Sequence, residues 1–357
     1  MAVVPHSGRS QPQLPKSRAE LSTTSRGHHT TGPPVARFPA ANSAIYRLWF
    51  LEMETWSIES IGTSTCRFNL GPMRISEGLQ IWTSNLTGWL RQWVKEGCNP
   101  FIHQQLYLDT GLPRCLQDAW TTLTAYFSKT PQNNHIVMKI IEDRADGLLQ
   151  EQAHDDDSFM AVPGLRTVEH LARVQALFIY QYLRLHDGSI RQRALAESSI
   201  GTLLVWCAQL WQSATMDADH GMQLSKDSDQ SAVYSEQTTL SHWKAWILSE
   251  SVRRTWLTCH STLAVYFRER DGWNECTGEI KFTASQGLWN AASSRAWAGL
   301  VSEREPLFVK SLHVDELLST AMYSEVDNFS TVLMALLMGR EEVDSWAAVT
   351  YESRAFS

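Results

Sequence analysis

The residues with the clearest chemical meaning lie in the segment WKAWILSESVRRTW, residues 243–256. Trp243 and Trp246 belong to an apolar stripe of helical period, and Glu250 and Arg254 project from the middle of that stripe. Glutamate four residues before arginine is the favourable order for an ion pair along a helix. A charge inside a buried stripe is costly unless it is paired and hydrogen-bonded. We therefore expect either a structural clamp in a helical core or a polar effector pocket that also includes Arg253.

Other residue types suited to catalysis or metal binding do not form a recognisable site. Three consecutive carboxylates, Asp155, Asp156 and Asp157, stand in a polar stretch that we interpret as a linker, and no second metal motif follows. The sequence contains no HExxH, GxSxG, GxGxxG or P-loop string. We therefore assign no catalytic and no metal-binding residues, and we predict that the protein is not an enzyme.

Composition limits the classes of function. The chain has 357 residues, is 43% hydrophobic and carries a formal charge of −7, which argues against holding nucleic acid by bulk electrostatics. It has six cysteines without any CxxC pair, and no signal peptide is evident. No apolar run reaches the roughly 18 residues that a membrane span needs. These features predict reduced thiols in a nuclear or cytosolic protein.

The elements that must position Glu250 and Arg254 are predicted to be helices. A short helix fits 44–59, and a loop fits 60–75. Helical period and capping signals predict longer helices at 76–96, 116–127, 134–151, 167–185, 189–211 and 243–268, and further helices at 284–302, 313–322 and 325–339. Residues 213–238 are polar and predict a long loop. Because no alternating strand pattern is evident, we predict an all-α fold with one large helical domain.

Composition changes along the chain predict three regions. Residues 1–42 are rich in Pro, Ser, Thr, Gly and His and contain five basic residues against the single acidic Glu20, so we predict a disordered basic tail. Residues 43–75 fit a linker that contains the short helix. Residues 76–350 fit the all-α domain.

Several strings, in their order and spacing, carry a resemblance to a known family. They are NPFIHQQLY at 99–107, LPRCLQDAWTTLTAYFSKTPQNNHIVMKIIEDRA at 112–145, LARVQALFIYQYLRLHDGSIRQRALAE at 171–197, WKAWILSESVRRTW at 243–256 and DGWNECTGEIKFTASQGLWNAASSRAWAGL at 271–300. Together they resemble the regulatory (middle homology) region of fungal zinc-cluster transcription factors. The resemblance covers roughly residues 70–346.

This resemblance implies an all-α regulatory domain in a transcriptional regulator that works in the nucleus and controls a biosynthetic or catabolic gene set. The partners that it implies are the transcription machinery or a DNA-binding protein, together with a small effector. DNA would be contacted indirectly or through a missing module, and no membrane is involved. Members of the family hold a binuclear zinc cluster with six cysteines near the N-terminus. Here the first cysteine is Cys66 and no two cysteines are close, so zinc ligands and DNA-binding residues cannot be assigned.

Two explanations of the missing zinc cluster remain open. The chain acts through a partner that binds DNA, or the gene model starts too late or describes a decayed copy. A different class of function also remains open, in which the chain is an all-α small-molecule-binding protein or enzyme with a polar site around Glu250 and Arg254. In that case the pair would open into a cavity that holds other polar groups.

Overall fold

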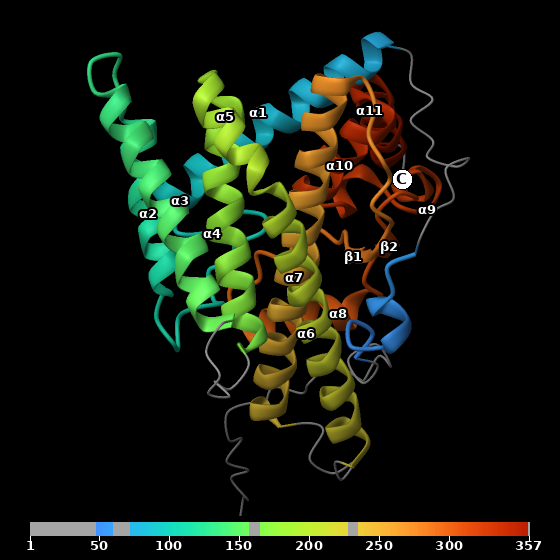
Figure 1. Cartoon of the computed structure of the whole chain (residues 1–357). Coiled ribbons are helices and arrows are strands. Elements are labelled where there is room, and N and C mark those ends of the chain that lie inside the picture. The colour runs from blue at the N-terminus through green and yellow to red at the C-terminus, as the bar shows by residue number, and fades with distance from the viewer. Residues whose placement is uncertain (1–47, 60–71, 157–164, 228–234, 356–357) are drawn as a thin grey trace, which may run out of the picture. The chain divides into compact units, whose positions relative to one another are not determined.

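The computed structural model describes residues 48–59, 72–156, 165–227 and 235–355, and these residues are mostly helical (Figure 1). The all-α prediction is therefore confirmed. The tail at 1–42 and the predicted loop over 60–71 lie outside the described residues. Of the predicted helix at 44–59, the part after residue 47 is described, and it contains one 3₁₀ turn, η1 (Met53–Trp56). Among the described residues no helix is long and apolar enough to cross a membrane.

The first three long helices agree with the predicted spans except at their ends. They are α1 (Pro72–Glu96), α2 (Arg114–Phe127) and α3 (Asn134–Asp156). The predicted start of α1 at Ser76 is four residues late, since the helix begins at Pro72, a residue whose fixed φ suits the first helical position. The predicted linker around Asp155 is also wrong, because α3 continues through Asp155 and Asp156, while Asp157 lies outside the described residues.

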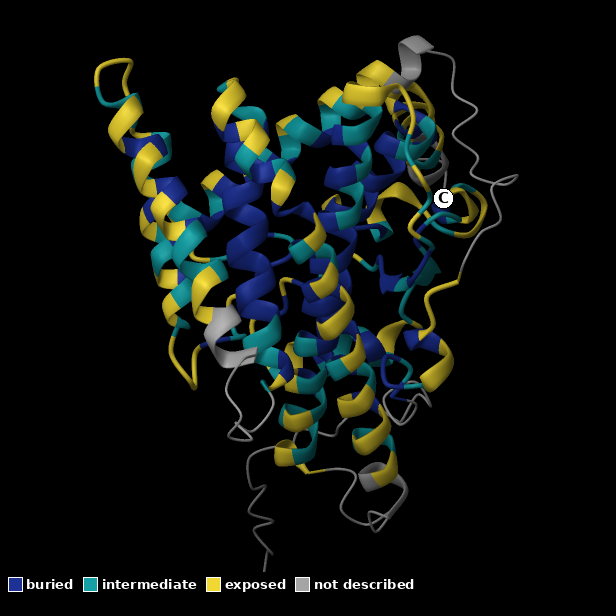
Figure 2. Ribbon diagram, in the orientation of Figure 1, coloured by how far each residue is buried: buried dark blue, intermediate teal, exposed yellow. Residues whose placement is uncertain are grey.

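Helix α4 (Thr167–His186) is buried on nearly every side, as its mostly apolar circumference predicts (Figure 2). It packs against α2, α3 and α7, and also against the two helices that follow it. Its polar residues Gln181 and Arg184 are buried as well, each about 1% exposed. The amide nitrogen of Gln181 donates to the main-chain oxygen of Ser199 at 2.7 Å, whereas its Oε1 has no hydrogen-bond partner among the described residues.

The helix predicted at 189–211 is two helices, α5 (Ile190–Ser198) and α6 (Ile200–Asp227), separated at Ser199. The loop predicted at 213–238 is wrong over most of its length, since α6 continues to Asp227. Ala214, Ala218 and Met222 recur every four residues and pack on the core, so α6 keeps an apolar stripe despite its polar composition.

The long helix α7 (Glu236–Asp271) carries the Glu250–Arg254 pair and begins seven residues before the predicted span. The Ser235 side chain caps its first turn by accepting from the Thr238 amide at 3.1 Å. Gly272, with φ of 79°, ends it in the left-handed conformation that glycine adopts without strain. One pair of caps thus defines a helix of 36 residues that contacts α1, α4, α6 and α8.

The C-terminal third departs most from the predicted helices. Instead of one helix at 284–302, the chain forms strand β1 (Lys281–Thr283), an irregular stretch, α8 (Ser294–Glu303) and strand β2 (Phe308–Lys310). The strands pair antiparallel, with Phe282 opposite Val309. The remaining described elements are two 3₁₀ turns and three helices: η3 (Val314–Glu316), α9 (Leu317–Thr320), η4 (Tyr323–Glu325), α10 (Asn328–Met338) and α11 (Arg340–Ala355).

The tryptophans belong almost entirely to the hydrophobic core. The largest fully buried side chains include Trp82, Trp93, Trp246 and Trp297, which lie on α1, α7 and α8. Trp273 is the exception, with 61% of its surface exposed. These rings fill space between the packed helices, which is how large aromatic side chains commonly stabilise helical cores.

Candidate functional site

The middle of α7 places two arginines and one glutamate in the interior. Glu250 and Arg253 have no exposed surface, and Arg254 is 1% exposed. In the described part of the chain, Arg254 and Glu250 form a buried i,i+4 ion pair, with Arg254 Nε 3.0 Å from Glu250 Oε1. The contact predicted from the four-residue spacing of Glu250 and Arg254 is therefore present. The other residues of the site are distant in the sequence.

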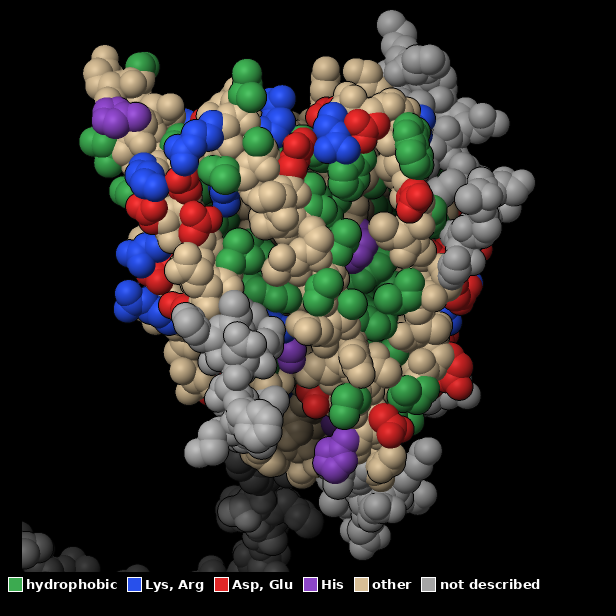
Figure 3. All heavy atoms as spheres, in the orientation of Figure 1, with side chains coloured by type: hydrophobic (Ala, Val, Ile, Leu, Met, Phe, Trp, Pro, Cys, Tyr) green, Lys and Arg blue, Asp and Glu red, His purple; other side chains and the backbone are tan. Residues whose placement is uncertain are grey.

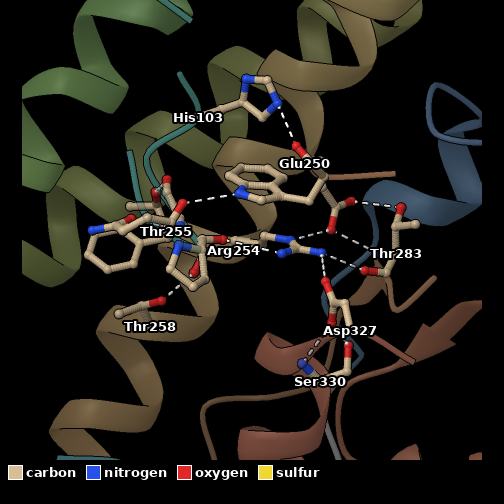
Figure 4. Close-up of polar contacts among 12 residues, drawn as sticks. His103, Glu250, Arg254, Thr255, Thr258, Thr283, Asp327 and Ser330 are labelled. Atoms are coloured by element: carbon tan, nitrogen blue, oxygen red, sulfur yellow. Dashed lines mark hydrogen bonds and ion pairs between the residues drawn. The ribbon is translucent and has the colours of Figure 1, made fainter. Parts of the chain in front are cut away.

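The carboxylate of Glu250 is satisfied by strand β1 as well as by Arg254 (Figure 4). Its Oε1 accepts from the main-chain amide of Thr283 at 3.0 Å, and its Oε2 accepts from the Thr283 hydroxyl at 3.0 Å. Both oxygens of the carboxylate are therefore hydrogen-bonded inside the protein. A general base must lie within reach of a substrate proton, and Glu250 has no exposed surface and lines neither of the two cavities described below.

The guanidinium of Arg254 has a second acidic partner that the sequence analysis missed. Its Nη2 lies 2.5 Å from Asp327 Oδ2, and it also donates to the Thr283 carbonyl at 2.9 Å and, from Nη1, to the Pro100 carbonyl at 3.3 Å. Burial opposes its charge, but the nearby carboxylates of Asp327 and Glu250 outweigh burial and raise the pKa of Arg254. The arginine is therefore charged at any pH at which the protein is folded.

Two aromatic rings complete the surroundings of Arg254. Its Cζ atom lies 4.4 Å from the ring centre of Trp289 and 5.0 Å from that of Phe329. Trp289 is in turn fixed by its indole, which donates to the Asn99 carbonyl at 3.0 Å, and by His103, whose Nε2 lies 2.8 Å from the Trp289 main-chain oxygen. Cations over aromatic faces in a dry interior gain energy that partly offsets their desolvation.

Asp327 joins the network because it is the N-cap of α10. Its Oδ1 accepts from the Ser330 amide at 2.9 Å and from the Ser330 hydroxyl at 2.6 Å, while Oδ2 faces Arg254. One side chain therefore caps a helix and neutralises a cation. An acidic residue three positions before Ser330, at the start of the apolar run 329–338, is a sequence signal that could have identified this cap.

Arg253 points to a different part of the fold. Its Nη2 donates to the Phe50 carbonyl at 2.9 Å and to the Thr55 hydroxyl at 3.0 Å, and its Cζ lies 4.0 Å from the Trp56 ring centre. Burial lowers its pKa to about 10, against the opposing charge of Glu250, so it is charged at neutral pH. Arg253 thus fastens the segment 48–59 to α7, while Arg254 fastens β1 and α10.

The polar groups of Glu250, Arg254 and Asp327 are hydrogen-bonded within the protein, and this limits what the network can bind. The described contacts connect Glu250, Arg254 and Asp327 with one another and with main-chain groups, and neither of the two cavities described below is lined by Glu250, Arg253 or Arg254. A network satisfied by protein groups favours the clamp over the pocket, since a ligand would have to displace existing bonds. Among the described residues no group of three or more His, Cys, Asp or Glu side chains is placed to hold a metal ion.

A comparison with known proteins gives an independent indication of function. Over 253 residues the chain is 30% identical to "Transcription factor gsfR2" of Penicillium aethiopicum, and this alignment covers 71% of the chain and 57% of that protein. No family model matches the chain, and no solved structure matches it. The chain is therefore similar in sequence to a fungal transcription factor over most of its own length, and it spans less than two thirds of that relative.

Proposed function

We propose that the protein is a transcriptional regulator of the fungal zinc-cluster type and acts in the nucleus through its helical region. The observation that carries this proposal is the similarity to a fungal transcription factor across 71% of the chain. The saturated network on α7 supports it as well, because the most charged part of the core is occupied by contacts that stabilise the fold. A regulator of this kind needs a stable binding scaffold and no reacting group.

In this proposal the Glu250–Arg254–Asp327 network is a structural clamp. It joins the middle of α7 to β1 and to the first turn of α10, which lie 29 to 73 residues further along the chain. Arg253 adds the segment 48–59, about 200 residues earlier in the chain. Adjacent side chains on α7 thus connect this helix to three segments that are distant in the sequence: 48–59, β1 and the start of α10.

The partners and target genes belong to the same proposal. We propose that the chain reaches DNA through a partner protein or through a zinc module that this sequence does not show, and that it controls a biosynthetic or catabolic gene set. The formal charge of −7 supports indirect binding, since a protein that held DNA by its own surface would gain affinity from a basic patch.

The experiment uses the source organism with the gene deleted and complemented by an epitope-tagged chain. We expect a tag signal in the nucleus, chromatin occupancy at a limited set of promoters, and a coordinated change of the neighbouring transcripts on deletion. A chain that purifies without DNA affinity but occupies chromatin would identify a DNA-binding partner. Unchanged transcripts together with no chromatin occupancy would refute the proposed function.

A further inference from the structure

Two neighbouring cavities lie at the C-terminal half of α7, away from the clamp. The smaller one, between α1, α7 and α10, has about 70 Å³ in which a water molecule can be centred. The larger one, between α6, α7 and the segment after α7, has about 320 Å³. Both are lined by the same five residues: His260, Ala264, Asn274, Glu275 and Thr277. The segment 274–277 therefore separates two parts of one hollow region.

His260 gives this region a polar group of defined character. Its ring stacks on Trp256, with centres 3.8 Å apart and planes 20° apart, and its Nδ1 lies 2.9 Å from the Trp256 carbonyl oxygen. A carbonyl oxygen can only accept, so Nδ1 carries the hydrogen. Burial lowers the pKa of His260 to about 4, so the ring is neutral at pH 7 and its Nε2 is a bare acceptor.

The Nε2 atom of His260 has no hydrogen-bond partner within the described part of the chain. The apolar part of the lining of the larger cavity includes Leu204, Leu263, Phe267 and Trp273, while polar and mostly exposed residues of the segment 270–277 form its edge. Trp273 is the one largely exposed tryptophan, and it stands at this cavity. Figure 3 shows hydrophobic side chains gathered over the middle of the molecular face, with charged groups mainly toward its margins.

Two of the three charged residues at the edge of the larger cavity, Arg270 and Asp271, are paired. Arg270 contacts Asp271 at 2.7 Å and Glu197 at 3.1 Å. Glu275, the third, is exposed and has no ion-pair partner within the described part of the chain, so its carboxylate disfavours an anionic ligand. An uncharged occupant gains affinity from apolar contact and from one hydrogen bond that it donates to the imidazole.

We propose that the larger cavity binds an uncharged aromatic small molecule whose hydroxyl group donates a hydrogen bond to His260 Nε2. The ligand is thus of the phenol class, and its ring lies against the apolar walls formed by α6, α7 and Trp273. The site is separate from the Glu250–Arg254 pair, for which the sequence left a structural clamp and an effector pocket as alternatives. It does not rest on the proposed function, because binding is measured on the purified chain without any transcriptional readout.

Two probes test the proposal by calorimetry on the full chain. They are 2-naphthol, which donates a hydroxyl hydrogen, and its methyl ether, which has the same rings and no donor. We expect 2-naphthol to bind roughly three- to tenfold more tightly than the ether, as one net hydrogen bond predicts. His260→Phe keeps an aromatic ring at this position, so it should retain binding of the ether and remove the preference for 2-naphthol.

Variants that fill the cavity locate the binding site. Ala264→Trp places an indole where both hollow parts meet and should reduce binding of both probes at least tenfold. Leu204→Trp, on the α6 wall, should also reduce binding of both probes at least tenfold. It replaces the first variant if that variant does not fold, which the circular dichroism spectrum and the thermal midpoint show. Val205→Trp is the matched control, because Val205 is 55% exposed beside Leu204 and does not line the cavity.

Three results would overturn this inference. The first is no measurable binding of either probe to the wild-type chain. The second is equal affinity of the wild-type chain for the phenol and its ether, since His260 would then contribute no acceptor. The third is undiminished binding of 2-naphthol to folded cavity-filling variants, which would place the ligand elsewhere.

Discussion

Replacement of Arg254 by alanine is the most direct test of the buried network. The substitution removes the cation that faces both Glu250 and Asp327, and it removes the donors to the Thr283 and Pro100 carbonyl groups. Removing one partner of a buried ion pair typically costs about 3–5 kcal/mol, because the other charge is left without compensation in the interior.

The structure supports this range and no larger value. Glu250 keeps two bonds from Thr283, and Asp327 keeps two from Ser330, so neither carboxylate is left without donors. A loss of about 3–5 kcal/mol in a domain of this size lowers the thermal midpoint by about 6–20 °C. It is also a large share of the roughly 5–15 kcal/mol by which folded proteins are stable.

The assay is unfolding of the full chain in urea and by heat, with a matched control on the surface. Arg340→Ala breaks an i,i+4 contact to Asp344 at 3.2 Å, in which both side chains are more than 60% exposed, and should cost about 1 kcal/mol or less. If Arg254→Ala unfolds at the same midpoint as Arg340→Ala, the buried pair contributes nothing special and the clamp is refuted. If Arg254→Met is partly rescued by Glu250→Gln and Asp327→Asn, the uncompensated carboxylates are the source of the loss.

Three further predictions concern the neighbours of the clamp. Asp327→Ala should destabilise the protein more than Ser293→Ala does, because Asp327 also neutralises a buried cation, whereas the Ser293 cap on α8 is worth about 1 kcal/mol. Urea unfolding midpoints of the two variants test this, and equal losses of stability would contradict it. Arg253→Met should release the segment 48–59, so that limited proteolysis cuts there in the variant before it cuts the wild-type chain; identical cleavage patterns would show that the arginine is not what holds it. Burial lowers the pKa of His103 to about 4 from an unfolded value of 6.5, so its contribution to stability is complete above pH 6.5 and is lost as the pH falls toward 4. Urea unfolding between pH 7 and 4 should therefore show a shallower pH dependence in His103→Asn, and an unchanged slope would count against this contribution.

Local spacing was enough to predict the parts of the site that lie on one helix. Glu250 and Arg254 are four residues apart, so helical geometry alone brings them together. Asp327 is 73 residues from Arg254, and no property of either residue in isolation indicates the contact. The Glu250–Arg254 contact was therefore predictable from the sequence. The contacts with Asp327 and Thr283 were not, because they depend on how α10 and β1 pack on α7.

Errors in the predicted elements also have physical causes. The strands Lys281–Thr283 and Phe308–Lys310 are three residues each, which is too short for alternation to be visible among helical patterns. The predicted span of α6 ended too early, at residue 211, because the second half of the helix is polar in composition. Its alanines, spaced four residues apart, are nevertheless enough to pack against the core. In both cases tertiary contacts decided a conformation that composition alone left ambiguous.

The two halves of α7 differ in how far the protein satisfies their polar groups. At Arg254 the described donors and acceptors are satisfied by the protein, whereas six residues later His260 presents an acceptor without a partner to a cavity. Six residues correspond to about 9 Å along a helix, so an occupant of the cavity would lie close to the clamp without touching its charges. A ligand shifts a conformational equilibrium only by its different affinity for the two states. Any response to a ligand at His260 would therefore depend on how differently the ligand contacts α6, the end of α7 and the segment 273–277 in the two states.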